Sequence, residues 1–213
     1  MLLNMIKCII SDMGNVFISF DNDIFLKKIV ENTYFSLSDI ARLVSENFEI
    51  LKSFDKGEIS PTEFYNKAVR IFKCDFDYNR FFKAYNDVFD LRTKELQILK
   101  KLKENYRVIL LSNTDVMRYG FIKKNFPEML IFDAYVLSYE EGYMKPDPSI
   151  YKAALKKTEA QADECLFIDD KEDNIDAANA LGINTIHFIV RADLAVELRK
   201  FNLVFDLNFL IKS

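Results

Sequence analysis

A short apolar run that ends in a carboxylate constrains the fold of this chain most. Residues 5–10 place apolar, largely β-branched side chains on both faces of an extended chain, and Asp12 and Gly14 follow. A strand that is apolar on both faces is typical of a parallel sheet buried between helices. Asp12 then lies at the carboxyl end of the strand, where open α/β sheets bind ligands and a carboxylate can act as a nucleophile or metal ligand. The alternative is an Asp that only caps a turn before Gly14.

The second half of the chain alternates between strand and helix patterns. We expect strands over residues 107–111, 131–137, 165–168 and 184–190, and helices over 93–105 and 175–181, the latter stopped by Gly182. Alternation of this kind indicates an α/β fold with a parallel sheet.

Residues 22–90 interrupt this pattern. Their apolar side chains recur at helical spacing, and Gly57 is the one glycine among them. Residues 60–63 predict a helix start, with Ser60 as the N-cap and Glu63 closing a capping box. We therefore expect an all-helical insert at 22–90 and a sheet unit formed by 1–21 and 91–213. The position of the insert suggests a lid over the ligand crevice; the alternative is a helical bundle with no role in binding.

Polar side chains follow three of the predicted strands. Asp12 ends the first strand, Ser112 begins a segment that looks like a helix N-cap, and Asp169 and Asp170 end the strand at 165–168. A helix amino terminus can bind phosphate, although capping alone would explain the segment. Adjacent carboxylates persist most easily beside a divalent cation, although a solvated loop also tolerates them. Lys145 lies on a loop between these segments and supplies a positive charge.

The joint pattern resembles the haloacid dehalogenase-like hydrolase superfamily. Its four motifs correspond here to residues 12–16, 111–114, 145–146 and 167–174, so the resemblance covers nearly the whole chain. It implies a Rossmann-like three-layer α/β/α parallel sheet with an inserted all-helical cap. Residues 56–60 are similar to the cap of the bacterial α-D-glucose-1-phosphate phosphatases, which implies a phosphomonoester hydrolase acting on a small phosphorylated metabolite such as a hexose 1-phosphate.

The resemblance also implies a magnesium-dependent mechanism. Asp12 would attack phosphorus and form an aspartyl-phosphate that water then hydrolyses. Mg²⁺ would be bound by Asp12, the Gly14 carbonyl and Asp170, with Asp169 as a nearby or alternate ligand and Asn174 orienting a ligand or water.

The phosphoryl group would be held by a second set of residues. The resemblance assigns its oxygens to Ser112, Asn113 and Lys145, with Ser112 and Lys145 also counted among the catalytic residues.

One position departs from the common pattern of these phosphatases. Most carry a second Asp two residues after the nucleophile as general acid and base, but this chain has Gly14 there. Either the leaving group needs little help, as an anomeric phosphate does, or Asp21 or a bound water supplies the proton. Two alternatives stay open: a metal-independent haloacid dehalogenase, which also lacks the second acid, and a catalytically weakened phosphate-binding protein.

Composition excludes several other classes. The net charge of the 213 residues is -4, and without a basic cluster the chain has no electrostatic footprint for nucleic acid. The odd set of cysteines Cys8, Cys74 and Cys165 predicts buried thiols in a reducing, cytoplasmic compartment. Residues 1–20 are interrupted by polar side chains, so we expect neither a signal peptide nor a membrane span. A monomer or homodimer is expected, and the phenylalanine stripe over 201–209 should pack on the core.

Overall fold

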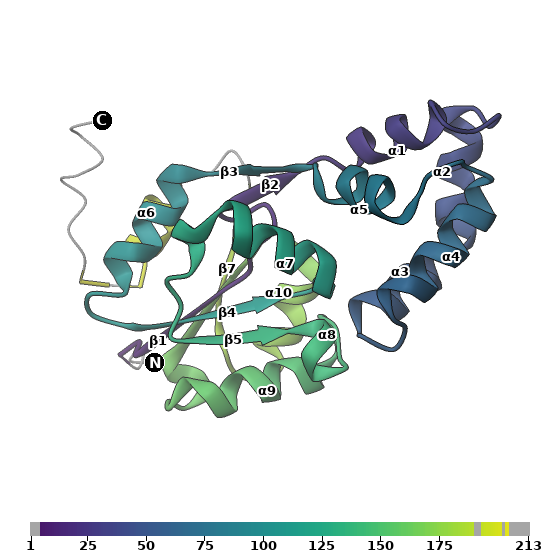
Figure 1. Cartoon of the computed structure of the whole chain (residues 1–213). Helices are drawn as coiled ribbons and strands as arrows, with labels where there is room; N and C mark the ends of the chain where they lie inside the picture. Colours follow the sequence, from purple (N-terminus) through teal and green to yellow (C-terminus); the bar gives the residue numbers. More distant parts are fainter. Residues whose placement is uncertain (1–4, 190–192, 202, 205–213) are drawn as a thin grey trace.

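A parallel sheet forms the centre of the molecule. The computed structural model describes residues 5–189, 193–201 and 203–204, and its main sheet has five strands in the order β5-β4-β1-β6-β7 (Figure 1). All neighbouring strands pair in parallel. The strands are β1 (Cys8–Ser11), β4 (Arg107–Ser112), β5 (Ala134–Leu137), β6 (Cys165–Asp169) and β7 (Asn184–His187). The predicted α/β fold class is confirmed, and the strand expected from residue 131 begins at Ala134.

Helices cover both faces of this sheet and produce three layers. The helices of the two outer layers are α6 (Thr93–Leu102), α7 (Val116–Asn125), α11 (Leu194–Arg199), α9 (Pro148–Thr158) and α10 (Glu172–Asn179). Ile9 of β1 belongs to the apolar core under α6, α7 and α11, whereas Cys8 and Ile10 belong to the core under α9 and α10. This alternation explains why β1 is apolar on both faces. Phe201 packs partly buried against the first core, and the other two phenylalanines of the predicted stripe lie outside the described residues.

The inserted segment folds into helices with a separate aromatic core. Its helices are α1 (Asn22–Val30), α2 (Leu37–Glu46), α3 (Phe48–Asp55), α4 (Pro61–Phe72) and α5 (Tyr78–Asn86). Phe54 stacks on Phe64 with ring centroids 4.3 Å apart, and both belong to this second core. The predicted start of α4 is confirmed, because Ser60 accepts a hydrogen bond from the Glu63 amide at 3.2 Å and the Glu63 carboxylate accepts one from the Ser60 amide at 2.8 Å.

A two-stranded ribbon, which no sequence pattern predicted, connects the helices to the sheet. The strands β2 (Ile18–Phe20) and β3 (Phe89–Leu91) pair antiparallel (Figure 1). The helical pattern expected up to residue 90 therefore ends earlier, at Asn86. The two crossings between the units pair with each other because this satisfies their backbone hydrogen bonds and brings the Phe20 and Phe89 rings to 6.3 Å.

Three side-chain contacts fix the helical unit over the carboxyl edge of the sheet. Ser138 of the short helix α8 (Ser138–Glu141) donates a hydrogen bond to the Asp55 carbonyl at 2.6 Å. Tyr85 of α5 donates to a buried Asp115 carboxylate oxygen at 2.8 Å, and Arg118 of α7 donates to Asn22 at 2.8 Å. The helices consequently lie beside the strand ends that carry the motif residues (Figure 1).

Candidate active site

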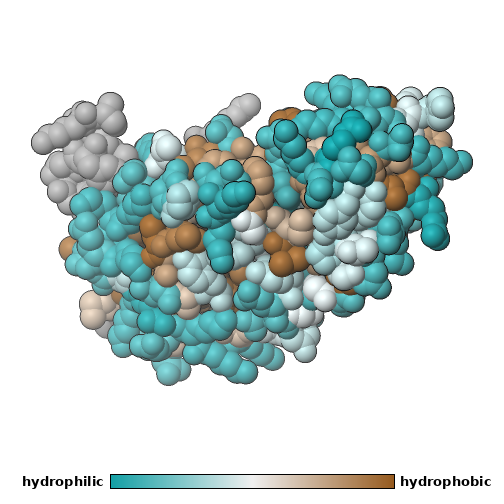
Figure 2. All heavy atoms as spheres, in the orientation of Figure 1, coloured by the Kyte–Doolittle hydropathy of each residue, from teal (hydrophilic) through white to brown (hydrophobic). Residues whose placement is uncertain are grey.

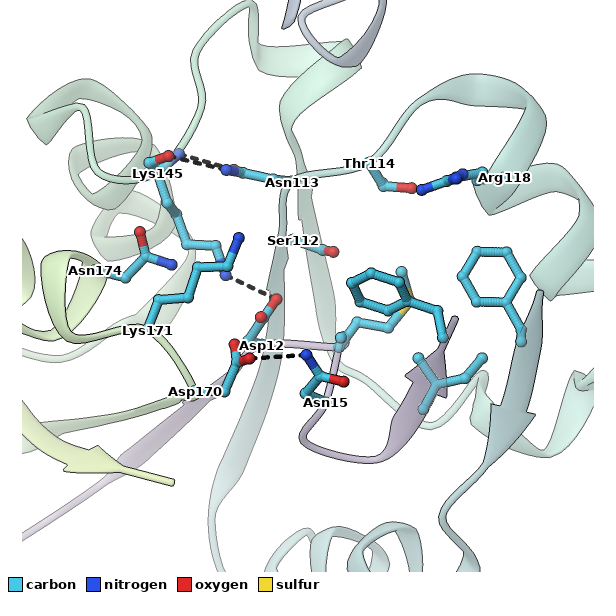
Figure 3. A pocket seen from close by; sticks show the side chains of 15 residues that line it. Asp12, Asn15, Ser112, Asn113, Thr114, Arg118, Lys145, Asp170, Lys171 and Asn174 are labelled. Atoms are coloured by element: carbon cyan, nitrogen blue, oxygen red, sulfur yellow. Dashed lines mark hydrogen bonds and ion pairs between the residues drawn. The ribbon is translucent and has the colours of Figure 1, made fainter. Parts of the chain in front are cut away.

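The strand ends enclose a pocket of about 80 Å³ at the carboxyl edge of the sheet. Asp12 follows β1, Ser112 ends β4 and Asp170 follows β6, and all three side chains line the pocket together with Lys145 (Figure 3). The Asp12 amide extends the pairing of β1 with β6 by donating to the Ile168 carbonyl at 2.8 Å. Parallel pairing therefore brings residues from distant parts of the sequence to one site.

Lys145 connects two carboxylates in the floor of this pocket. Its Nζ lies 2.7 Å from Asp12 Oδ1 and 2.6 Å from Asp169 Oδ2, and the lysine is only 5% exposed. Burial raises the pKa of Asp12 to about 7, an effect that Lys145 opposes and Asp169 reinforces. Burial alone would lower the pKa of Lys145, but the two carboxylates outweigh it and raise that pKa.

Protein groups occupy both carboxylate oxygens of Asp169. Oδ1 accepts hydrogen bonds from the Lys171 amide at 2.8 Å and from Asn174 Nδ2 at 2.9 Å. Oδ2 accepts from Lys145 and, at 3.0 Å, from Asn174. Asp169 is fully buried, so its contacts orient Lys145 and Asn174 toward the pocket.

Asp170 is more open to the pocket than Asp169. Its Oδ2 accepts one hydrogen bond, from Asn15 Nδ2 at 2.9 Å, and its side chain is partly exposed. One carboxylate oxygen from each of Asp12, Asp169 and Asp170 lies within 4.8 Å of the other two. Oxygen donors at this spacing fit a hard divalent cation such as Mg²⁺.

Two of the predicted phosphate-binding residues, Ser112 and Asn113, lie on the side of Asp12 away from Asp170 (Figure 3). Within the described residues the Ser112 hydroxyl has no protein hydrogen-bond partner, and it lines the pocket. Asn113 instead accepts from the Lys145 amide at 2.8 Å and donates to the Lys145 carbonyl at 2.9 Å (Figure 3). The structure thus places Asn113 where it fixes the backbone that carries Lys145.

The helix start predicted at residues 112–115 is confirmed, at the last of these residues. The N-cap of α7 is Asp115, whose Oδ1 accepts from the Met117 amide at 2.8 Å and the Arg118 amide at 2.9 Å. The Asp115 carboxylate therefore accepts the hydrogen bonds of two helix amides that could otherwise have bound a phosphate. Burial raises the pKa of Asp115, and Tyr85 holds its second oxygen.

The pocket also contains side chains for which the sequence motifs predicted no role, among them those of Asn15, Lys171 and Arg118. Asn15 adopts φ 56°, in the left-handed region, which turns its amide toward Asp170. Lys171 lies alongside Lys145 and Arg118 lies at the opposite end (Figure 3). A signal for Asn15 and Lys171 existed, because both lie inside the quoted motifs. Asp21, the candidate proton donor, is exposed, caps α1 and does not line the pocket.

A family model of the haloacid dehalogenase-like hydrolases matches residues 6–182, which span all the strands and motif residues described above except those of β7. The chain belongs to this family. No helix among the described residues is long and apolar enough to cross a membrane.

Relatives of this family member include phosphatases with unlike substrates. A sesquiterpene phosphatase of Aspergillus oryzae is 26% identical over 91% of this chain and 95% of the relative. A D-ribitol-5-phosphate phosphatase of Bacteroides thetaiotaomicron is 27% identical over 91% of this chain and 97% of the relative. The crystal structure of a family enzyme from Bacteroides thetaiotaomicron, in complex with magnesium and inorganic phosphate, matches with TM-score 0.79 and 30% identity, covering 91% of this chain and 100% of that one.

Proposed function

We propose that this chain is a magnesium-dependent phosphomonoester hydrolase with Asp12 as the nucleophile. The observation that carries the proposal is the convergence of Asp12, Asp170 and Lys145 in one pocket, where the Asp12 carboxylate lies near the Asp170 carboxylate and pairs with the buried Lys145 ammonium group. The magnesium and phosphate bound to the similar bacterial enzyme support the same chemistry.

The residues that would hold the cation are Asp12 and Asp170, with the Gly14 carbonyl as a third oxygen. Asp169 belongs to the same acidic group, but its oxygens already accept hydrogen bonds from Lys145, Asn174 and the Lys171 amide. These oxygens would give the site a divalent cation whose positive charge would offset that of the phosphoryl oxygens and favour the ionised form of Asp12. Asn15 holds Asp170 in place for this role.

The phosphoryl group would be bound by Ser112, Lys145 and Lys171. The Ser112 hydroxyl is free to donate a hydrogen bond, and the two ammonium groups offset the negative charge. Asp12 then attacks phosphorus, the ester oxygen leaves, and water hydrolyses the aspartyl-phosphate. Asn113 contributes by fixing the position of Lys145.

Proton donation to the leaving group is the step that this site supports least. Among the described residues that line the pocket, Asp12 and Asp170 are the only carboxylates. The leaving group must therefore depart with little acid assistance, as the anomeric oxygen of a hexose 1-phosphate does, or take its proton from water.

We also propose that residues 22–90 act as a cap that restricts access to this pocket.

The cellular location belongs to the same proposal. All three cysteines of the chain are free and buried, which supports a reducing, cytoplasmic compartment.

Phosphate release from an aryl phosphate tests the proposal. The wild type should be active with Mg²⁺, inactive with a chelator, and active again when Mg²⁺ is restored. Asp12→Asn should abolish turnover, whereas the exposed Asp173→Asn serves as the matched control and should not. Chelator-resistant release of chloride from a 2-chloroacid would favour a dehalogenase. Phosphate binding without turnover would favour a phosphate-binding protein.

A further inference from the structure

A second cavity lies inside the helical unit, next to the active site. Its volume is about 130 Å³, and apolar side chains of α1, α2, α3 and α4 form most of its wall, among them Phe25, Leu43, Leu51 and Phe64. Figure 2 shows apolar residues gathered in the recess where the helical unit meets the sheet unit. Nothing in the proposed hydrolysis uses this cavity.

The Asn47, Tyr85 and Asn22 side chains in the cavity wall already have partners in the protein, and among the described polar groups of the wall Arg118 Nε is buried without one. Asn47 donates to the Leu43 carbonyl at 2.8 Å, and Tyr85 donates to Asp115. Asn22 accepts from Arg118. A sugar in this cavity would lose hydrogen bonds to water with few protein groups to replace them, whereas an apolar group would lose none.

Arg118 connects the cavity to the active site. It lines both spaces, and Figure 3 shows it on the side of the active-site pocket away from Lys145 and Asp170. Its guanidinium lies 4.2 Å from the centroid of the Tyr85 ring. Arg118 also lies 5.7 Å from the centroid of the Phe89 ring, which is 6.3 Å from the Phe20 ring, and both rings line the active-site pocket together with Ile18. Apolar side chains therefore adjoin Arg118 in this pocket.

We propose that this cavity binds the apolar part of the leaving group, so that the substrate is the phosphate monoester of an apolar alcohol. The inference rests on the proposed phosphatase function and specifies its substrate class. The phosphate is held by Lys145 and Ser112, the first carbons contact Ile18 and Phe20, and the end of the chain passes Arg118 into the cavity. An apolar cavity of about 150 Å³ can hold a benzene-sized ligand, so about four to six carbons fit here.

A series of 4-alkylphenyl phosphates, from methyl to butyl, tests this assignment. The leaving-group pKa is nearly constant along the series, so any trend in kcat/KM reports binding of the alkyl chain. We expect kcat/KM to rise about fourfold per methylene, the value for transfer of one methylene from water to an apolar site. Glucose 1-phosphate should be a poorer substrate than 4-butylphenyl phosphate.

Two matched alanines provide the variants. Ala68 of α4 lines the cavity and Ala84 of α5 does not, although both belong to the aromatic core and are 5% and 6% exposed. Ala68→Leu should remove the chain-length dependence and keep activity on phenyl phosphate, whereas Ala84→Leu should keep the dependence. If Ala68→Leu does not fold, the wild-type series decides alone.

The outcomes separate this inference from the phosphatase proposal. Turnover of phenyl phosphate with no dependence on chain length, or faster turnover of glucose 1-phosphate, would refute the apolar site and leave the phosphatase function intact. If no phosphomonoester is hydrolysed, calorimetric binding of the unphosphorylated 4-alkylphenols decides: affinity that rises with chain length and is lost in Ala68→Leu supports the site, and absence of binding overturns it.

Discussion

Replacing Lys145 with methionine should destabilise the protein strongly and in a pH-dependent way. The lysine is 5% exposed and pairs with Asp12 at 2.7 Å and Asp169 at 2.6 Å. Removing one partner of a buried ion pair typically costs about 3–5 kcal/mol because the remaining charge is left uncompensated. Methionine is similar in length to lysine, so the main change is the loss of the positive charge. We therefore expect the free energy of unfolding to fall by about this amount at pH 8.

The loss should be smaller at pH 5. Burial already raises the pKa of Asp12 to about 7, and Lys145 is the largest influence that opposes this. Without Lys145 the pKa of Asp12 rises further. A carboxyl group whose pKa is raised by folding stabilises the folded state less as pH increases. At pH 5 Asp12 takes up a proton and relieves the repulsion with Asp169, so Lys145→Met should lose stability steeply between pH 5 and pH 8.

Urea unfolding followed by circular dichroism, in the presence of a chelator, measures this difference. The matched control is Lys157→Met, because Lys157 makes an equally short pair with Glu141 at 2.7 Å but is 38% exposed in its side chain. Partly exposed pairs contribute about 0–1 kcal/mol, so the control should shift little at either pH. Equal losses for the two variants, or a Lys145→Met loss that does not change with pH, would refute the argument from the buried charge network.

Three further predictions concern other parts of the structure. A Cβ at Gly57, which has φ 71°, would overlap a carbonyl oxygen of α8, so Gly57→Ala should lower the thermal midpoint more than Gly142→Ala, where φ is 75° but no atom lies within 4 Å. Burial and the nearby charge of Asp115 raise the pKa of Asp55 to about 7, so ionisation of Asp55 destabilises the fold as pH rises through this range. Asp55→Asn should therefore stabilise the protein by about 2–4 kcal/mol at pH 8 and little at pH 4, as urea unfolding at both values would show. Gly14→Asp should raise single-turnover rates on alkyl phosphates by up to about 10²–10⁴-fold relative to aryl phosphates, and an unchanged ratio would mean that position 14 cannot supply an acid.

The sequence determined the sheet and the residues at its edge. The apolar run before Asp12 predicted a buried parallel strand because burial on both faces leaves a local pattern, and β1 indeed contributes to the cores on both sides. The same reasoning brought Asp12, Ser112 and Asp170 to one edge, since parallel strands end together.

The hydrogen-bond partners of these residues follow only from the tertiary structure. Asp169 and Asp170 are adjacent in the sequence, but only the fold shows how their surroundings differ. Asp169 accepts hydrogen bonds from Lys145 and Asn174, whereas Asp170 accepts one from Asn15 and is more open to the pocket. The pairing of β2 with β3 could not be predicted from the sequence either, because strands of three residues are too short to show a periodic pattern.

The cavity beside Arg118 depended on tertiary structure entirely. Its wall comes from the five helices α1 to α5 of the inserted unit, and Arg118 of α7 lines both the cavity and the active-site pocket. Helical periodicity predicts which side chains face inward, but it does not show whether they fill the space between them. That space is set by how the helices pack, which is a property of the folded chain.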